Sequence, residues 1–163
     1  MSSVKVPETY LTTAERYDEI PIVEYAQQMS KDYTSADVEE LTRLTTHNAN
    51  SDTALLGPYS PDTSSYEQIA HENGFTYFDA GTNGWNAISE VDIDLAHEVN
   101  DEFLQQQIDS GKDIVLTYDP VVAREVYDES GGRAMVSYNN ELTKLKEFGY
   151  EIKREGQFWR ATK

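Results

Sequence analysis

The stretch NDEFLQQQIDSGKDIVLTYDP, residues 100–120, passes directly from an amphipathic helix through a glycine into an apolar strand. Val99, Phe103 and Ile108 follow the three-and-four spacing of a helix that lays one face on a core. Gly111 is expected to end that helix, because glycine adopts the left-handed conformation of a C′ position without a steric clash. The run IVLTY that comes next has the composition of a strand. The stretch therefore predicts a central unit in which a helix leads straight into a buried strand.

The same order of helix, glycine and strand occurs three times: NG before FTYFD, SG before KDIVLTY, and FG before YEIK. Crossovers between parallel strands are right-handed and usually contain a helix. We therefore expect these strands to share a sheet with the short run ALLG, at least the first three in parallel. The sequence predicts an α/β fold: a small Rossmann-like three-layer sandwich with a mostly parallel sheet and a C-terminal β-hairpin about Glu155 and Gly156.

A cluster of turn-forming residues, THNANSD at 46–52, precedes this regular order. Before it, helices predicted at 22–29 and 35–44 have thin apolar faces and need another surface to pack on. We expect residues 1–45 to form a helical N-terminal extension. Residues 46–163 are expected to form the α/β domain.

The composition of the 163 residues excludes several classes of site. With 38% hydrophobic residues the chain can form a true core. It has no cysteine, which excludes disulfides, cysteine–zinc sites and thiol nucleophiles. His47, His71 and His97 do not have the spacing of metal ligands, and His47 is interpreted as an exposed loop residue. Nothing resembles a signal peptide or a membrane-spanning segment, so we expect a soluble protein and no membrane partner.

The chain is strongly acidic, with 30 acidic and 13 basic residues and a formal net charge of −17. This charge repels phosphate backbones, so strong DNA binding is not expected. Basic residues gather in residues 142–163, where they could form a locally positive face. The acidic excess also suits adaptation to high salt or docking to a basic partner, and the composition leaves these open.

The candidate site consists of polar residues at predicted strand ends, because the sequence has no GxGxxG, P-loop, HExxH or GxSxG pattern. The ends of parallel strands meet at one edge of a sheet, where open α/β proteins bind ligands. The candidate catalytic residues are Asp119, Asp79 and Glu141. The candidate substrate-binding residues are Tyr59, Ser60, Trp85 and Thr117.

Asp119 is the first choice for the acid–base or metal-binding group, because it follows the most apolar strand, where partial burial would raise its pKa. The alternative is a turn residue before Pro120. Asp79 would share its polar or metal contacts. Glu141 either belongs to the same site as these polar residues or stabilises its own helix by interacting with the helix dipole. Trp85, in the predicted loop AGTNGWN at 80–86, is either a lid over the core or a surface on which a ligand stacks. The sequence indicates no particular cofactor or metal.

The segments LLGPY, SYEQIAHENGFTYFD, NDEFLQQQIDSGKDIVLTY and ELTKLKEFGY, with Trp85 and Trp159, resemble in order and spacing a toxin module at the C-termini of bacterial polymorphic toxins. The resemblance covers about residues 46–163, and its individual motifs are mostly structural. It implies that residues 1–45 are a pretoxin linker. His97 stands where the relatives often have an aromatic residue, three positions before the asparagine that matches Asn100. The resemblance implies secretion or contact-dependent delivery, harm to a competing cell and a cognate immunity protein, but no particular reaction.

Two classes of function are compatible with these features. The first is a toxin enzyme, a hydrolase or nuclease acting on a small nucleotide or RNA, in which a strand-end carboxylate acts as general base or stabilises an oxocarbenium-like transition state. The charge favours a small nucleotide over a long polyanion. The second is a non-enzymatic acidic module, immunity-like or an adaptor, that docks to a basic partner in the cytoplasm. Toxicity on expression in bacteria would distinguish them.

Overall fold

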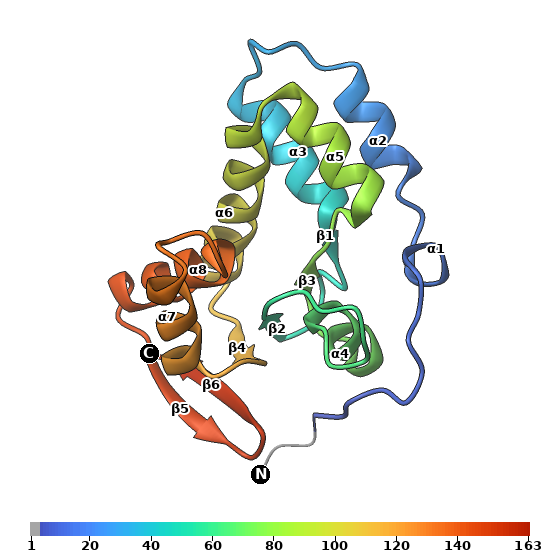
Figure 1. Ribbon diagram of the computed structural model, residues 1–163. Helices are drawn as coiled ribbons and strands as arrows, with labels where there is room; N and C mark the ends of the chain where they lie inside the picture. Colours follow the sequence, from blue (N-terminus) through green and yellow to red (C-terminus); the bar gives the residue numbers. More distant parts are fainter. Residues whose placement is uncertain (1–3) are drawn as a thin grey trace.

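The computed structural model describes residues 4–163, which form eight helices and six strands (Figure 1). The helices are α1 (Thr13–Arg16), α2 (Ile20–Gln27), α3 (Ser35–Thr45), α4 (Tyr66–Asn73), α5 (Gly81–Val91), α6 (Ile93–Asp109), α7 (Pro120–Glu129) and α8 (Val136–Glu147). The strands are β1 (Thr46–His47), β2 (Thr53–Leu56), β3 (Tyr77–Phe78), β4 (Asp113–Leu116), β5 (Glu151–Glu155) and β6 (Phe158–Thr162). Among the helices of these residues, none has the length and apolar character needed to cross a membrane.

Four strands form the main sheet in the order β2-β4-β6-β5. β2 and β4 are parallel, whereas β6 is antiparallel to both β4 and β5. Just before β3, Thr76 forms a parallel bridge with Ala54 of β2, and the Leu55 N–H donates to the Thr76 carbonyl at 2.9 Å. The predicted α/β class is confirmed. The sheet is mixed rather than mostly parallel, because the turn after β5 returns the chain so that β6 pairs with β4.

The central helix and strand are α6 and β4. The buried residues of α6 include Val99, Phe103 and Ile108, as its spacing predicts. Gly111 has a φ of 68°, the left-handed conformation, and the Lys112 N–H reaches back to the Gln107 carbonyl. α6 ends at Asp109 and β4 begins at Asp113, so the predicted unit is present.

The chain is extended at Asp92, which separates α5 from α6 and accepts a hydrogen bond from the Asp94 N–H. The segment AGTNGWN, predicted as a loop, contributes most of its residues to α5. A Cβ at Gly84 would lie 3.0 Å from Cγ2 of Ile22 in α2, so glycine lets the two helices approach closely. This packing outweighs the low helix propensity of glycine and asparagine.

The N-terminal helices share the core of the α/β part. Ile22 of α2 and Leu41 of α3 are buried in one cluster with Leu95 and Val99 of α6. Figure 1 shows α2 beside α5, and α3 beside the first half of α6. The turn-rich segment 46–52 begins with β1, which pairs antiparallel with β3. The core therefore continues across the predicted boundary between residues 45 and 46.

An extended segment precedes these helices and runs along one side of the molecule in Figure 1. The Asn73 side chain pairs with both the N–H and the carbonyl of Lys5, at 2.9 and 2.7 Å. The Gln68 side chain holds the N–H and the carbonyl of Leu11 in the same way, each at 2.9 Å. We call residues 4–19, which include α1, the N-terminal strap.

Candidate functional site

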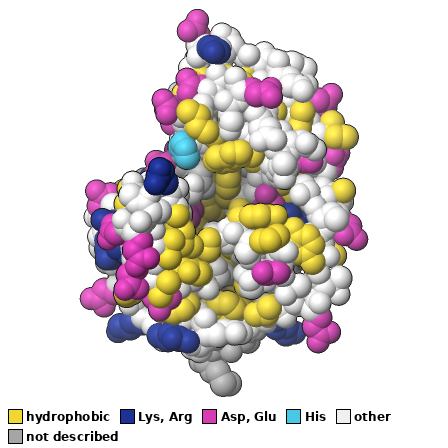
Figure 2. Space-filling model, in the orientation of Figure 1, with side chains coloured by type: hydrophobic (Ala, Val, Ile, Leu, Met, Phe, Trp, Pro, Cys, Tyr) yellow, Lys and Arg dark blue, Asp and Glu magenta, His cyan; other side chains and the backbone are white. Residues whose placement is uncertain are grey.

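A cavity of about 740 Å³ lies beside the C-terminal ends of β2 and β3, and we call it the central cavity. Figure 2 shows a hollow in this face of the molecule with hydrophobic side chains around it. The aromatic residues on its wall include Tyr59, Tyr66, Trp85 and Tyr138. Its polar residues include Arg16, Glu67, Asp79, Asn100, Arg133 and Glu141. The wall therefore combines stacking surfaces, two guanidinium groups and three carboxyl groups.

Four of the seven candidate residues from the sequence line this cavity: Tyr59, Asp79, Trp85 and Glu141. They come from the loop after β2, the end of β3, α5 and α8. Tyr59 is 66% exposed, and its hydroxyl lies 3.5 Å from that of Tyr10. Trp85 makes edge contacts with Phe78 and His97, at centroid distances of 6.5 and 6.0 Å, so it packs on the core while also facing the cavity.

The other three candidates are not among the residues that line the central cavity. Asp119 is the N-cap of α7, and its carboxylate accepts a hydrogen bond from the Val121 N–H at 2.9 Å. This role agrees with the alternative interpretation of Asp119 as a turn residue before Pro120. Thr117 packs against Gly57, where a Cβ would come within 1.9 Å of its hydroxyl oxygen. The Ser60 N–H donates to the Ser65 hydroxyl at 2.9 Å within the loop before α4.

A shared metal site of Asp79 and Asp119 is not formed. One Asp79 oxygen accepts from Arg16 and the other from the Gly81 N–H, whereas Asp119 caps α7. Within residues 4–163, no three histidine, aspartate or glutamate side chains come together as metal ligands.

Glu141 is a buried carboxyl group on the wall of the central cavity. It lies on the buried side of α8 and faces Asn100 of α6. Burial raises the pKa of Glu141 to about 8, and the polar contact with Asn100 only partly opposes this shift. At neutral pH the side chain therefore holds a proton that it can donate. A carboxyl group with a pKa in this range suits general acid–base chemistry.

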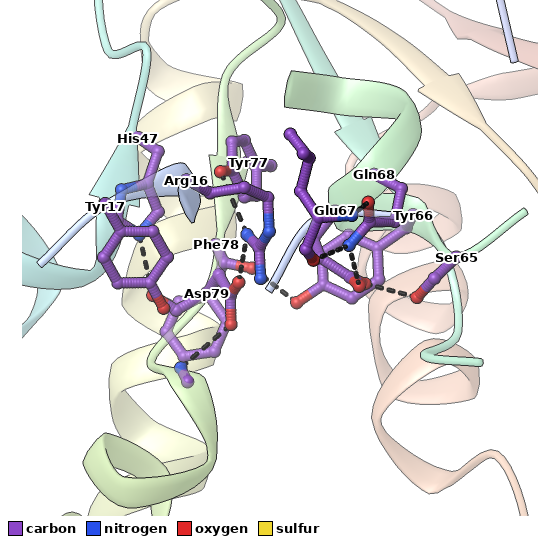
Figure 3. A network of polar contacts seen from close by, with 12 residues as sticks. Arg16, Tyr17, His47, Ser65, Tyr66, Glu67, Gln68, Tyr77, Phe78 and Asp79 are labelled. Carbon is purple, nitrogen blue, oxygen red and sulfur yellow. Dashed lines mark hydrogen bonds and ion pairs between the residues drawn. The ribbon is translucent and has the colours of Figure 1, made fainter. Parts of the chain in front are cut away.

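Asp79 anchors the N-terminal strap rather than standing free. Its carboxylate forms an ion pair with Arg16 at 2.6 Å, and it also accepts the Gly81 N–H at 2.9 Å (Figure 3). Its backbone carbonyl accepts the Tyr17 hydroxyl at 3.1 Å and lies 2.8 Å from Nε2 of His47. Both carboxylate oxygens are therefore engaged, and Asp79 is a positioning residue in this arrangement.

His47 is not the exposed loop residue expected from the sequence. It lies in β1 between the rings of Tyr17 and Tyr77, at centroid distances of 3.9 and 4.9 Å. The pairing of β1 with β3 carries it inward beside Tyr77. Burial lowers the pKa of His47, and the charge of Arg16 lowers it further, although the Asp79 carbonyl opposes the shift. The surroundings of His47 therefore favour its neutral form.

The sequence analysis did not identify two largely buried acidic or basic residues of the cavity, Glu67 and Arg16. Glu67 stands three residues after Ser64, the spacing of a capping box, but α4 begins at Tyr66 and Glu67 is buried on the cavity wall. It accepts hydrogen bonds from the Ser65 hydroxyl and the Gln68 amide, and burial raises its pKa. A signal was present, because Glu67 and Gln68 are polar residues directly before the apolar pair Ile69 and Ala70.

Arg16 is the second missed residue. Its side chain is only 4% exposed, although it comes from the strap that the sequence assigns to an extension. Nη1 donates to Asp79 and, at 3.2 Å, to the Tyr77 hydroxyl. Burial alone would lower the pKa of Arg16, but Asp79 and Tyr77 raise it, so the guanidinium stays charged. No periodic pattern marks such a residue.

A second cavity, of about 860 Å³, lies between α3, α6 and α8, and it shares Asn100, Ser137 and Glu141 with the central cavity. The acidic side chains on its wall are Glu39, Asp94, Glu98, Asp101, Glu102 and Glu141. Glu141 therefore stands where an aromatic cavity with two arginines meets an acidic one.

Comparison of the chain with protein-family models, with curated proteins and with solved structures gave no match, so the function has to be argued from this site.

Proposed function

We propose that the chain is a toxin enzyme that acts on a small nucleotide-type ligand of a competing bacterial cell, with Glu141 as its general acid–base. The observation that carries this proposal is the location of Glu141, which is a buried carboxyl group at the meeting point of two cavities, beside the C-terminal edge of a partly parallel sheet. Ligands of open α/β proteins bind at this edge of the sheet. A site in this position therefore also favours a small Rossmann-like arrangement.

The central cavity suits such a ligand in size and chemistry. A volume of about 740 Å³ lies within the range of small-molecule sites. Trp85 and Tyr59 offer aromatic faces for a base, and Arg16 and Arg133 offer positive charge. The net charge of −17 favours a small nucleotide over RNA.

Hydrolysis is the reaction that these residues support best. The Glu141 carboxyl gives its proton to the leaving group as the bond to that group breaks. The resulting carboxylate then takes a proton from the attacking water, which restores the acid. Asn100 orients the carboxyl group. Because the pKa of Glu141 is about 8, activity is expected to fall as the pH rises through that value, measured as a pH–rate profile.

Growth on inducible expression in a bacterial cytoplasm tests the proposal. The wild-type chain should be toxic, and Glu141→Gln should remove toxicity while circular dichroism and melting temperature show a folded protein. Glu147→Gln is the matched control, because it is an exposed glutamate on the same helix. Equal killing by the Glu141→Gln variant would contradict the catalytic role. Rescue by a co-expressed immunity protein would support delivery as a polymorphic toxin.

A second candidate function is a non-enzymatic module that docks to a basic partner. The acidic wall of the second cavity favours it, because a partner with lysine and arginine side chains would be electrostatically complementary. The same growth assay separates the two candidates. A soluble, folded chain that does not slow growth would favour the binding module.

A further inference from the structure

One edge of the Arg16 guanidinium lacks a hydrogen-bond partner in the part of the chain that the structure describes. The hydrogen bonds from Arg16 to Asp79 and Tyr77 both use Nη1. Nε is buried and finds no hydrogen-bond partner among residues 4–163. A buried donor without a partner costs free energy, and native proteins leave few of them. An unpaired edge on a side chain that is 4% exposed therefore calls for a partner from outside the chain.

The unused edge has the geometry that recognises an anion. Nε and Nη2 of an arginine donate in parallel, and this fork matches two oxygens of a phosphate or a carboxylate. Arg16 lines the central cavity, and Figure 3 shows its guanidinium between the side chains of Asp79 and Glu67. Asp79 holds the group from one side, so little side-chain entropy is lost when a ligand binds on the other.

The charges around Arg16 decide which ligand is favourable. The titratable groups on the wall are the arginines Arg16 and Arg133 and the carboxyl groups of Asp79, Glu67 and Glu141, together with several tyrosines. Burial raises the pKa values of both glutamates, so their proton-bound forms repel an anion less. Asp79 offsets one arginine, and Arg133, exposed at the wall, remains as a second cation.

We propose that Arg16 binds a phosphate group of the ligand through Nε and Nη2, so that the ligand is a nucleoside phosphate rather than a free base or nucleoside. The inference rests on the proposed function, since it takes the nucleotide class from there. Tyr59 and Trp85 then cover the nucleoside, and Arg133 faces the outer phosphate oxygens. The N-terminal strap contributes the anion-binding residue, so the site is incomplete without residues 4–19.

Calorimetric titration of the full chain tests this with AMP and GMP against adenosine and guanosine, and with inorganic phosphate. We expect at least one nucleotide to bind about tenfold or more tightly than its nucleoside, a typical effect of one charge-assisted bidentate contact. The double variant Arg16→Gln/Asp79→Asn, which leaves no unpaired buried charge, should bind nucleotide and nucleoside alike. Arg124→Gln is the control, because Arg124 is exposed on α7, where it contacts Asp128 and the Tyr127 ring.

Arg16→Lys is a second variant in case the double variant does not fold. It keeps the charge but loses the fork, and it should reduce the preference for the nucleotide. The inference is overturned if nucleotide and nucleoside bind equally to the wild-type chain, if neither binds, or if the preference survives in a folded Arg16 variant.

The binding titration and the growth assay test the two proposals separately. If Glu141→Gln removes toxicity while nucleotide and nucleoside bind equally, the proposed function stands and the phosphate site fails. If toxicity survives Glu141→Gln but nucleotide preference depends on Arg16, the phosphate site stands and the catalytic assignment fails.

Discussion

The N-terminal strap and the α6–β4 unit serve the same site in opposite ways. In α6, apolar residues recur at regular spacing, and Val99 and Phe103 are fully buried. The α6–β4 unit therefore serves as the scaffold of the site. The strap is mostly irregular, and side-chain amides of α4 hold its backbone. Nevertheless it brings Arg16 to the cavity. The difference teaches that a regular pattern identifies the scaffold, whereas the functional side chains can lie on a segment held by polar contacts.

Removal of residues 1–45 is the strongest test of this comparison. The sequence predicts that residues 46–163 fold alone. We expect instead that this fragment fails to fold cooperatively, because loss of Ile22 and Leu41 would expose Leu95 and Val99 of α6 to water. Circular dichroism during urea unfolding checks it. A sharp, cooperative transition of the fragment would show that residues 46–163 fold as an independent domain. The N-terminal part would then not be needed for folding.

A pair of single substitutions, one in each region, separates two kinds of stabilisation. Phe103→Ala in α6 should cost about 3–5 kcal/mol through the lost apolar contacts and the cavity that remains. Arg16→Met in the strap should cost about 3 kcal/mol, because it leaves the Asp79 carboxylate largely buried and unpaired. Urea denaturation gives both values.

A double variant then distinguishes the causes. Adding Asp79→Asn to Arg16→Met should recover part of the loss, because no charge is left unpaired. The same addition to Phe103→Ala should recover nothing. Additive effects in the Arg16 pair would mean that the ion pair does not hold the strap.

The pH dependence of stability should reveal how the strap is held. The fold lowers the pKa of His47, so the native state favours the neutral ring and the unfolded state binds the proton more readily. This contribution is complete above the unfolded pKa of about 6.5 and is lost as the pH falls through the lower folded value. Melting temperatures of the wild type and of His47→Gln should therefore converge between pH 7 and pH 5. A constant difference between the two melting temperatures would show that titration of His47 does not contribute to the pH dependence of stability.

Several parts of this molecule could be predicted from the sequence because they depend on local patterns. The glycine stop at Gly111 requires only a left-handed residue between helix and strand. Asp79 and Glu141 could be predicted as cavity residues because both are polar and lie near the ends of predicted elements. α5 was missed, because Gly84 favours a helix only through its contact with Ile22, which is distant in sequence. Arg16 was missed for the same reason: its partner Asp79 is brought to it only by the tertiary fold.

The smallest expected effect concerns Asp119, which follows β4 at the end of the α6–β4 unit. Asp119→Ala should cost about 1 kcal/mol, because α7 loses the side chain that accepts the Val121 N–H. Asp119→Asn should be nearly neutral, since asparagine caps helices as well as aspartate does. Neither variant should change toxicity, because the residue does not line the central cavity. Loss of toxicity in Asp119→Asn with unchanged stability would move the chemistry to the end of β4, and the α6–β4 unit would then carry the active site as well as the scaffold.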